Sequence, residues 1–166
     1  MERFVRIVDA FTEALGRGVS WLVLVMTIVT CVVVVLRYGF SVGSIALQES
    51  VLYLHGMVFM LGIPYALKHD AHVRVDVLYG RMSARMRDWV DLAGHVLFLL
   101  PLAGFVLYVS WDYTARSWRI LEGSQEVGGI HAVFLLKSLI PLLAVTLALQ
   151  GVAEILHIVL RRTGRS

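Results

Sequence analysis

Charged residues, cysteine and proline are all scarce in this sequence. Only 16% of its 166 residues are charged and 58% are hydrophobic, whereas a soluble domain usually has about 25% charged residues. The single cysteine, Cys31, excludes a disulfide or a thiolate metal centre within one chain. The three prolines, Pro64, Pro101 and Pro141, all lie inside apolar runs. The low charge content therefore points to a membrane protein.

Four long apolar runs are separated by clusters of charged residues. A helix needs roughly 20 residues to cross a bilayer. Inside lipid the backbone has to satisfy its own hydrogen bonds, so we expect each run to be a helix. We predict an all-α membrane protein with one four-helix domain, residues 18–160. Its transmembrane helices are expected at residues 18–36, 50–67, 92–111 and 132–160.

Residues 1–17 have the pattern of an amphipathic helix. Apolar side chains recur at helical spacing on one face: Phe4, Val8, Phe11 and Leu15. Glu13 and Arg17 stand four residues apart, a favourable spacing for an ion pair on a helix. We predict an interfacial helix that lies on membrane lipid. The alternative is an arm that docks on a partner protein.

The third helix is predicted to be longer than a membrane span requires. Ser83 has the side chain of an N-cap residue. We expect the helix to continue past residue 111, through DYTARSWRILEG, until Gly123 ends it. A helix of about 40 residues would be about 60 Å long. It would therefore protrude from the membrane or tilt strongly.

Lysine and arginine are unevenly distributed between the two sides of such a bundle. Eleven lie in the N-terminal segment, the link between the second and third helices, and the basic tail, residues 161–166; four lie on the other side. The positive-inside rule then places both termini and the central link in the cytoplasm. Because the basic residues mark membrane edges, they indicate no nucleic-acid partner.

The central link contains the stretch HDAHVRVDVLYGR, residues 69–81. His72, Arg74 and Asp76 alternate in it with valines, so one side can rest on apolar surface while the other makes polar contacts. We predict that Arg74 and Asp76 form a structural charge network that holds this turn to nearby helix ends or to another subunit. A metal site is not expected, because the two histidines of the stretch have no obvious third ligand.

Four further polar residues are predicted to lie at membrane depth. Glu49 and Lys137 should be near the outer ends of the second and fourth helices, where unpaired charges are costly. They are expected to pair with each other, with Arg37 or with another subunit. Gln150 and Glu154 form a polar spot toward the inner half of the fourth helix. We interpret this spot as a packing or subunit contact, because a proton pathway would need a chain of such groups.

Enzymatic chemistry has no visible basis in the sequence. We find no nucleophile–base arrangement, phosphate-binding loop or paired-carboxylate site, so we expect neither an enzyme nor a cofactor. One alternative is a haem-binding cytochrome b-type anchor of an oxidoreductase, with His95 and His157 as the axial ligands. Another is a self-contained four-helix oligomer with a structural role.

Several short motifs occur in order along the chain. They are QE at residues 48–49, HVRVD at 72–76, WVDL at 89–92, SW at 117–118, GSQEVGGI at 123–130 and KSLIPLLAVTLALQG at 137–151. The ordered set resembles the small permease subunit, the DctQ family, of tripartite ATP-independent periplasmic (TRAP) transporters. The resemblance covers roughly residues 15–158, which is nearly the whole chain.

The resemblance implies a role in secondary transport. Such transporters import organic solutes, often carboxylates, across the bacterial inner membrane, typically with a sodium gradient. A periplasmic solute-binding protein captures the solute, and a large permease subunit (DctM-like) holds the solute and ion sites. The resemblance implies that the four-helix small subunit packs beside the static scaffold of the large subunit and anchors it, without touching the solute.

Seven motif positions are carried over from the resemblance: Gln48, Glu49, His72, Arg74, Asp76, Lys137 and Gln150. Together with Glu154, we predict that they belong to a subunit interface or to a structural charge network. None is predicted to be catalytic or to bind a metal or cofactor.

Overall fold

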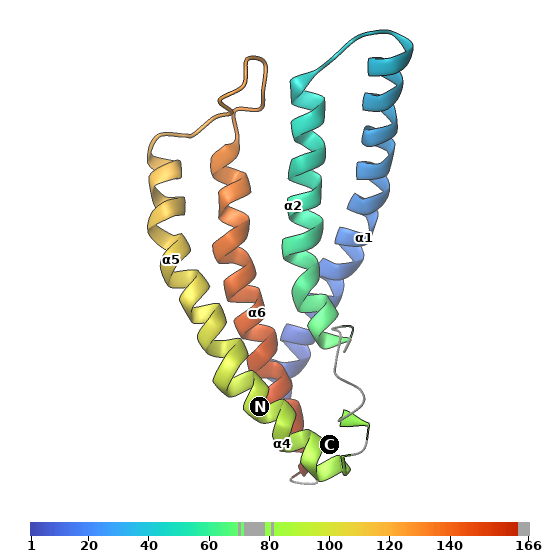
Figure 1. The fold of residues 1–166 in the computed structure, drawn as a ribbon. Helices are drawn as coiled ribbons and strands as arrows, with labels where there is room; N and C mark the ends of the chain where they lie inside the picture. The colour runs from blue at the N-terminus through green and yellow to red at the C-terminus, as the bar shows by residue number, and fades with distance from the viewer. Residues whose placement is uncertain (70, 72–78, 81, 163–166) are drawn as a thin grey trace.

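The computed structural model of the chain describes residues 1–69, 71, 79–80 and 82–162 (Figure 1). Its helices are α1 (Glu2–Gly39), α2 (Ile45–Lys68), α4 (Ala84–Gly94), the π-helical turn η1 (His95–Leu99), α5 (Leu100–Arg119) and α6 (Val133–Arg162). The three elements α4, η1 and α5 follow one another without a break and form one rod. Together with α1, α2 and α6, this rod makes four helices long and apolar enough to cross a membrane. The predicted all-α, four-span architecture is therefore confirmed, and the protein is a multi-pass membrane protein.

The N-terminus and the C-terminal end of α6 lie at the same end of the bundle, which we call the termini end (Figure 1). Residues 40–44 and 120–132 connect helices at the opposite end, which we call the loop end. This arrangement fits an even number of membrane crossings. The cytoplasmic location of the termini end stays a prediction from the charge distribution.

Residues 2–17 are helical, as predicted, and they continue into the first span as one helix of 38 residues. Their apolar residues do not share one environment. Val8 is only 7% exposed and packs inside the bundle, whereas Phe4 and Phe11 are exposed. At Gly16 a Cβ atom would overlap the ring of Tyr65, so this glycine allows α1 and α2 to approach closely. The N-terminal segment is thus part of the packed bundle.

The rod begins where the sequence predicts, with Ser83 as the N-cap; its Oγ accepts a hydrogen bond from the Met86 N–H. The π-helical turn ends at Leu99, two residues before Pro101, which has no N–H and whose ring crowds the preceding turn. A wider turn at this point accommodates the proline. The helix ends at Arg119, four residues before the predicted stop at Gly123, and Leu121 takes a left-handed φ of 46°.

The central helix of the bundle is α6. It packs against α1, α2, α4, η1 and α5. Small side chains make this possible: Ala144 and Ala153 are buried, and a Cβ atom at Gly151 would overlap the side chain of Leu99. Small residues are typical of helix interfaces in membranes, where close van der Waals packing stabilises association.

An apolar groove of about 790 Å³ separates α2 from the rod along one side of α6. We call it the α2–α5 groove. Its apolar lining includes Ile63 and Leu67 of α2, Phe98, Leu102 and Val106 of the rod, and Leu143 and Leu147 of α6.

Candidate functional site

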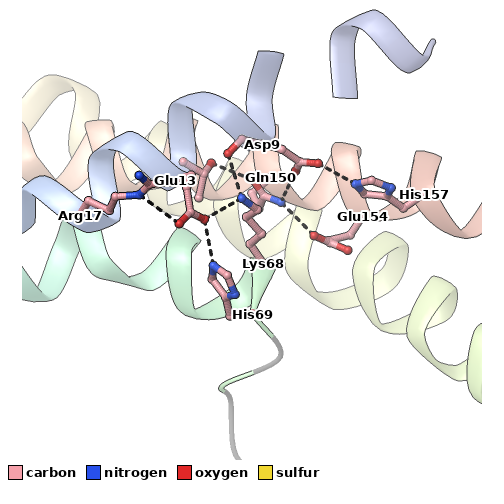
Figure 2. Close-up of polar contacts among 9 residues, drawn as sticks. Asp9, Glu13, Arg17, Lys68, His69, Gln150, Glu154 and His157 are labelled. Carbon is pink, nitrogen blue, oxygen red and sulfur yellow. Dashed lines mark hydrogen bonds and ion pairs between the residues drawn. The ribbon is translucent and has the colours of Figure 1, made fainter. Parts of the chain in front are cut away.

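Polar side chains gather at both ends of the bundle. The larger group lies at the termini end and is drawn in Figure 2. We call it the termini-end cluster. Its members are Asp9, Thr12, Glu13 and Arg17 of α1, Lys68 and His69 at the end of α2, and Gln150, Glu154 and His157 of α6. These residues join α1 to the next helix, α2, and to the last helix, α6.

Gln150 is the centre of the termini-end cluster and is fully buried, with 0% of its surface exposed. Its Oε1 accepts a hydrogen bond of 2.8 Å from Thr12 Oγ1. Its Nε2 donates to Asp9 Oδ1 at 3.2 Å and to Glu154 Oε1 at 2.8 Å. The acceptor and both donor positions of the amide are therefore used. Because an unsatisfied buried amide is costly, this residue favours the observed docking of α1 on α6.

Asp9 connects the buried amide to the surface. Its Oδ2 lies 2.8 Å from His157 Nε2, and its backbone carbonyl accepts a hydrogen bond of 3.0 Å from Lys68 Nζ. One residue of α1 thereby contacts both α2 and α6.

Glu13, one turn along α1 from Asp9, joins α1 to α2. Its Oε2 accepts from Lys68 Nζ at 2.8 Å and lies 3.0 Å from His69 Nε2. Its Oε1 pairs with Arg17 at 3.3 Å, as the four-residue spacing predicts. Glu13 and Lys68 are both largely shielded from solvent, whereas the Arg17 side chain is 76% exposed. The pair with Lys68 is therefore the more stabilising one, because solvent screens exposed pairs.

A second set of contacts at the termini end joins the last turn of α6 to the start of α4. The Asp88 carboxylate accepts from Arg161 at 2.6 Å and from Arg162 at 3.4 Å. Arg162 also donates to the Arg85 carbonyl at 2.9 Å and lies 4.7 Å from the centre of the Trp89 ring. Two arginines expected to define topology therefore also fasten the rod to α6.

At the loop end, Glu49 fastens residues 120–132 to α2. Its Oε2 accepts a hydrogen bond of 2.6 Å from the Ile130 N–H, and its Oε1 accepts one from Ser124 Oγ. The sequence predicts Lys137, Arg37 or another subunit as the partner of Glu49. Within this chain the structure pairs it with the connecting segment and not with Lys137 or Arg37, and a contact with another subunit stays a prediction.

Lys137 fastens the same segment to α6. Its Nζ donates to Glu122 Oε2 at 2.5 Å and lies 4.1 Å from the centre of the Tyr113 ring. The lysine beside Glu122 lowers the pKa of that carboxyl below its ordinary value. Glu49 and Lys137 therefore do not pair with each other, and each forms hydrogen bonds with residues 120–132.

The predicted site residues fall into three groups. Gln150 and Glu154 meet in the termini-end cluster, and Glu49 and Lys137 lie at the loop end. Gln48 projects from α2 at the loop end and is exposed. His72, Arg74 and Asp76 lie outside the described residues, so the charge network proposed for them stays a prediction.

Sequence reasoning missed several members of the termini-end cluster. No role was predicted for Asp9 or Thr12, and the only partner predicted for Glu13 was Arg17. A usable signal was present, because Thr12 and Glu13 lie three and four residues after Asp9 and so share its face of α1. Their partners on α6 have the same spacing, and two of them, Gln150 and Glu154, were predicted as a polar spot. Which helices these two faces meet is not given by the spacing.

Nothing in the described residues supports the haem alternative. Nε2 of His157 is already held by Asp9 at 2.8 Å.

Comparison with known proteins identifies the family. The family model for the DctQ component of tripartite ATP-independent periplasmic transporters matches residues 26–161. A curated relative, the C4-dicarboxylate TRAP transporter small permease protein DctQ of Vibrio cholerae serotype O1, is 26% identical over 117 residues. That alignment covers 67% of this chain and 50% of the relative, so the chain spans about half the relative's length. No solved structure matches the chain.

The match of the family model runs through α2, the rod and α6, together with the last third of α1, residues 26–39. It includes Glu49, Lys68, Lys137 and Gln150, which fasten the helices to one another or to their connecting segment. The chain therefore belongs to the DctQ family, the small permease component of TRAP transporters, which is a transport component and not an enzyme.

Proposed function

We propose that this protein supports and anchors the scaffold of a large permease subunit in the bacterial inner membrane. The complete transporter would import a carboxylate solute, driven by a sodium gradient. The solute class is supported by the name of the Vibrio cholerae relative, a C4-dicarboxylate transporter component. The orientation follows from the excess of lysine and arginine at the termini end.

The distribution of polar contacts carries this proposal. The hydrogen bonds and ion pairs that join different helices concentrate at the two ends of the bundle, at Gln150 and Glu13 and at Glu49 and Lys137. Between these ends, α5 and α6 are packed by small residues such as Ala103 and Ala144. Moving an ion or a carboxylate across a membrane requires a connected series of polar groups. A bundle whose helices are joined at both ends and closely packed between them is suited to a structural role beside another subunit.

Two partners follow from this role. The large permease subunit would lie beside the bundle in the membrane. The periplasmic solute-binding protein would approach the loop end, where Glu49 and Lys137 hold residues 120–132 in place.

Co-purification from the native membrane tests the proposal. The chain should bring down a multi-spanning protein that mass spectrometry identifies as a TRAP large subunit. Liposomes that contain both subunits should take up solute when the binding protein and a sodium gradient are supplied, and liposomes with this chain alone should not. Uptake by the isolated chain, or purification without a multi-spanning partner, would contradict the proposal.

A further inference from the structure

One face of α2 is exposed along the first two thirds of the helix. The exposed residues follow one another at intervals of three or four: Ile45, Gln48, Leu52, His55 and Phe59. Leu52 and Phe59 are 56% and 58% exposed. Residues with this spacing lie on the same side of a helix. We call this surface the α2 stripe.

His55 is the unusual member of the α2 stripe. It is ten residues from the start of α2, or about 15 Å at the rise of an α-helix. A hydrocarbon core is about 30 Å thick, so His55 lies near its middle. Among the described residues the imidazole has no hydrogen-bond partner, and its ring stacks on Phe59 with the ring centres 6.3 Å apart. Lipid chains offer no hydrogen bond to such a group.

The exposed surfaces of α1 and α6 at similar depth are different. Thr27 and Thr30 of α1 are exposed, but their hydroxyls donate to the carbonyls of Val23 and Met26 in their own helix, at 2.9 and 2.8 Å. Between residues 133 and 150 of α6, the part at similar depth, the exposed residues are apolar: Leu135, Leu142, Val145 and Leu149. These two surfaces suit lipid, whereas the α2 stripe suits a partner with hydrogen-bonding groups.

The α2 stripe leads into the α2–α5 groove. Ile63, four residues after Phe59, lines the groove, and so does Leu67 one turn later. A helix lying on the stripe could therefore place apolar side chains into the groove while a polar group meets His55. This continuity favours an extended transmembrane helix as the occupant over a single lipid chain.

We propose that the α2 stripe is the docking face for a transmembrane helix of the large permease subunit, with His55 forming a hydrogen bond to that helix. The inference rests on the proposed function and names the surface through which it operates. Gln48, at the loop end of the stripe, supplies a second polar contact nearer the membrane boundary.

Site-specific photo-crosslinking in membranes that contain the complete transporter tests the docking face. A benzophenone amino acid replaces Leu52 or Phe59 on the stripe, or Leu142 of α6 as the control. Leu142 is 43% exposed, and it is nine residues from the start of α6, so its depth nearly matches that of His55. Irradiation should join the chain to the large subunit from the two α2 positions and not from Leu142.

The results separate this inference from the proposed function. If the large subunit co-purifies but crosslinks from Leu142 and not from α2, the docking face is wrong and the proposed function stands. Adducts from α2 only with lipid or with a second copy of the chain would also overturn the docking face. If no large subunit co-purifies, the proposed function itself fails.

Two substitutions test the role of His55. His55→Leu should lower the amount of co-purified large subunit roughly three- to tenfold, as expected for loss of one hydrogen bond between membrane helices. His55→Gln keeps a hydrogen-bonding side chain and should retain most of the association. The isolated variants should be as stable as the parent, because the ring of His55 stacks only on Phe59 of the same helix among the described residues. Equal association of all three proteins would overturn the role of His55.

Discussion

Gln150 of α6 and Thr12 of α1 are joined by a 2.8 Å hydrogen bond, although 138 residues separate them in the sequence. Both side chains are almost completely buried, with 0% and 3% of their surfaces exposed. The same amide also binds Asp9 and Glu154. This single side chain therefore decides how the first and last helices of the bundle dock.

Replacing Gln150 by leucine should destabilise the bundle. The substitution Gln150→Leu removes the partner of the Thr12 hydroxyl and one partner of Asp9 in a buried place. We expect the free energy of unfolding to fall by about 1–3 kcal/mol, measured by chemical denaturation in detergent. Leu149→Ala, at an exposed neighbouring position, is the control and should change it by less than about 1 kcal/mol. Equal effects of the two substitutions would show that the amide is not central.

Two glycines of α1 should respond in opposite directions to the same substitution. At Gly16 a Cβ atom would overlap the Tyr65 ring, so Gly16→Ala should destabilise the protein by about 1–3 kcal/mol. At Gly18 nothing lies within 4 Å, so Gly18→Ala should be neutral or stabilise the helix by up to about 1 kcal/mol. Thermal unfolding of the two variants in one detergent measures the difference. A loss of stability at both positions would argue against the close approach of α1 and α2.

The ion pair of Glu13 and Lys68 should show measurable coupling. A double-mutant cycle with Glu13→Gln and Lys68→Met is expected to give a measurable coupling free energy, because both side chains are only partly exposed. A cycle with Glu13→Gln and Arg17→Met should give less, since Arg17 is mostly exposed. When both cycles are repeated in high salt, the coupling free energy of the exposed pair, Glu13 and Arg17, should fall by the larger fraction. The reverse order of coupling would contradict the packing described for this cluster.

The contact of Glu122 with Lys137 should make the loop end sensitive to acid. The neighbouring lysine lowers the pKa of Glu122 from an ordinary value of 4.5. A lowered pKa in the folded state contributes stability above the ordinary value, and this contribution is lost as pH falls through the lower value. Hydrogen exchange of residues 120–132 should therefore be slower in the parent than in Glu122→Gln at pH 7. The difference should shrink as the pH falls below 4.5, and a difference that grows on acidification would contradict the pairing.

Some features of the fold followed directly from residue order. Ser83 is the N-cap of the rod, and the third helix does extend well past a single membrane span. Both features depend on interactions between residues close in the sequence: an N-cap hydroxyl bonds a backbone N–H three residues on, and helical hydrogen bonds span four residues. The end of that helix was predicted too late, since a left-handed φ at Leu121 stops it before any glycine is reached.

The partners of charged residues did not follow from residue order. Glu49 and Lys137 were placed near the loop end, but their contacts with Ile130, Ser124 and Glu122 depend on how residues 120–132 fold back over the helix ends. Similarly, Val8 was assigned to a lipid-facing stripe and is buried in the bundle.

The sequence by itself determined that the chain is a four-helix membrane protein of the DctQ family, because hydropathy and ordered motifs are properties of the linear chain. Tertiary structure decided that α6 is central, that Gln150 is its buried junction with α1, and that His55 is left exposed on α2. The physical reason is that lipid and protein interior are equally apolar. Hydropathy therefore shows which segments leave water, and only packing in three dimensions shows which neighbour each face meets.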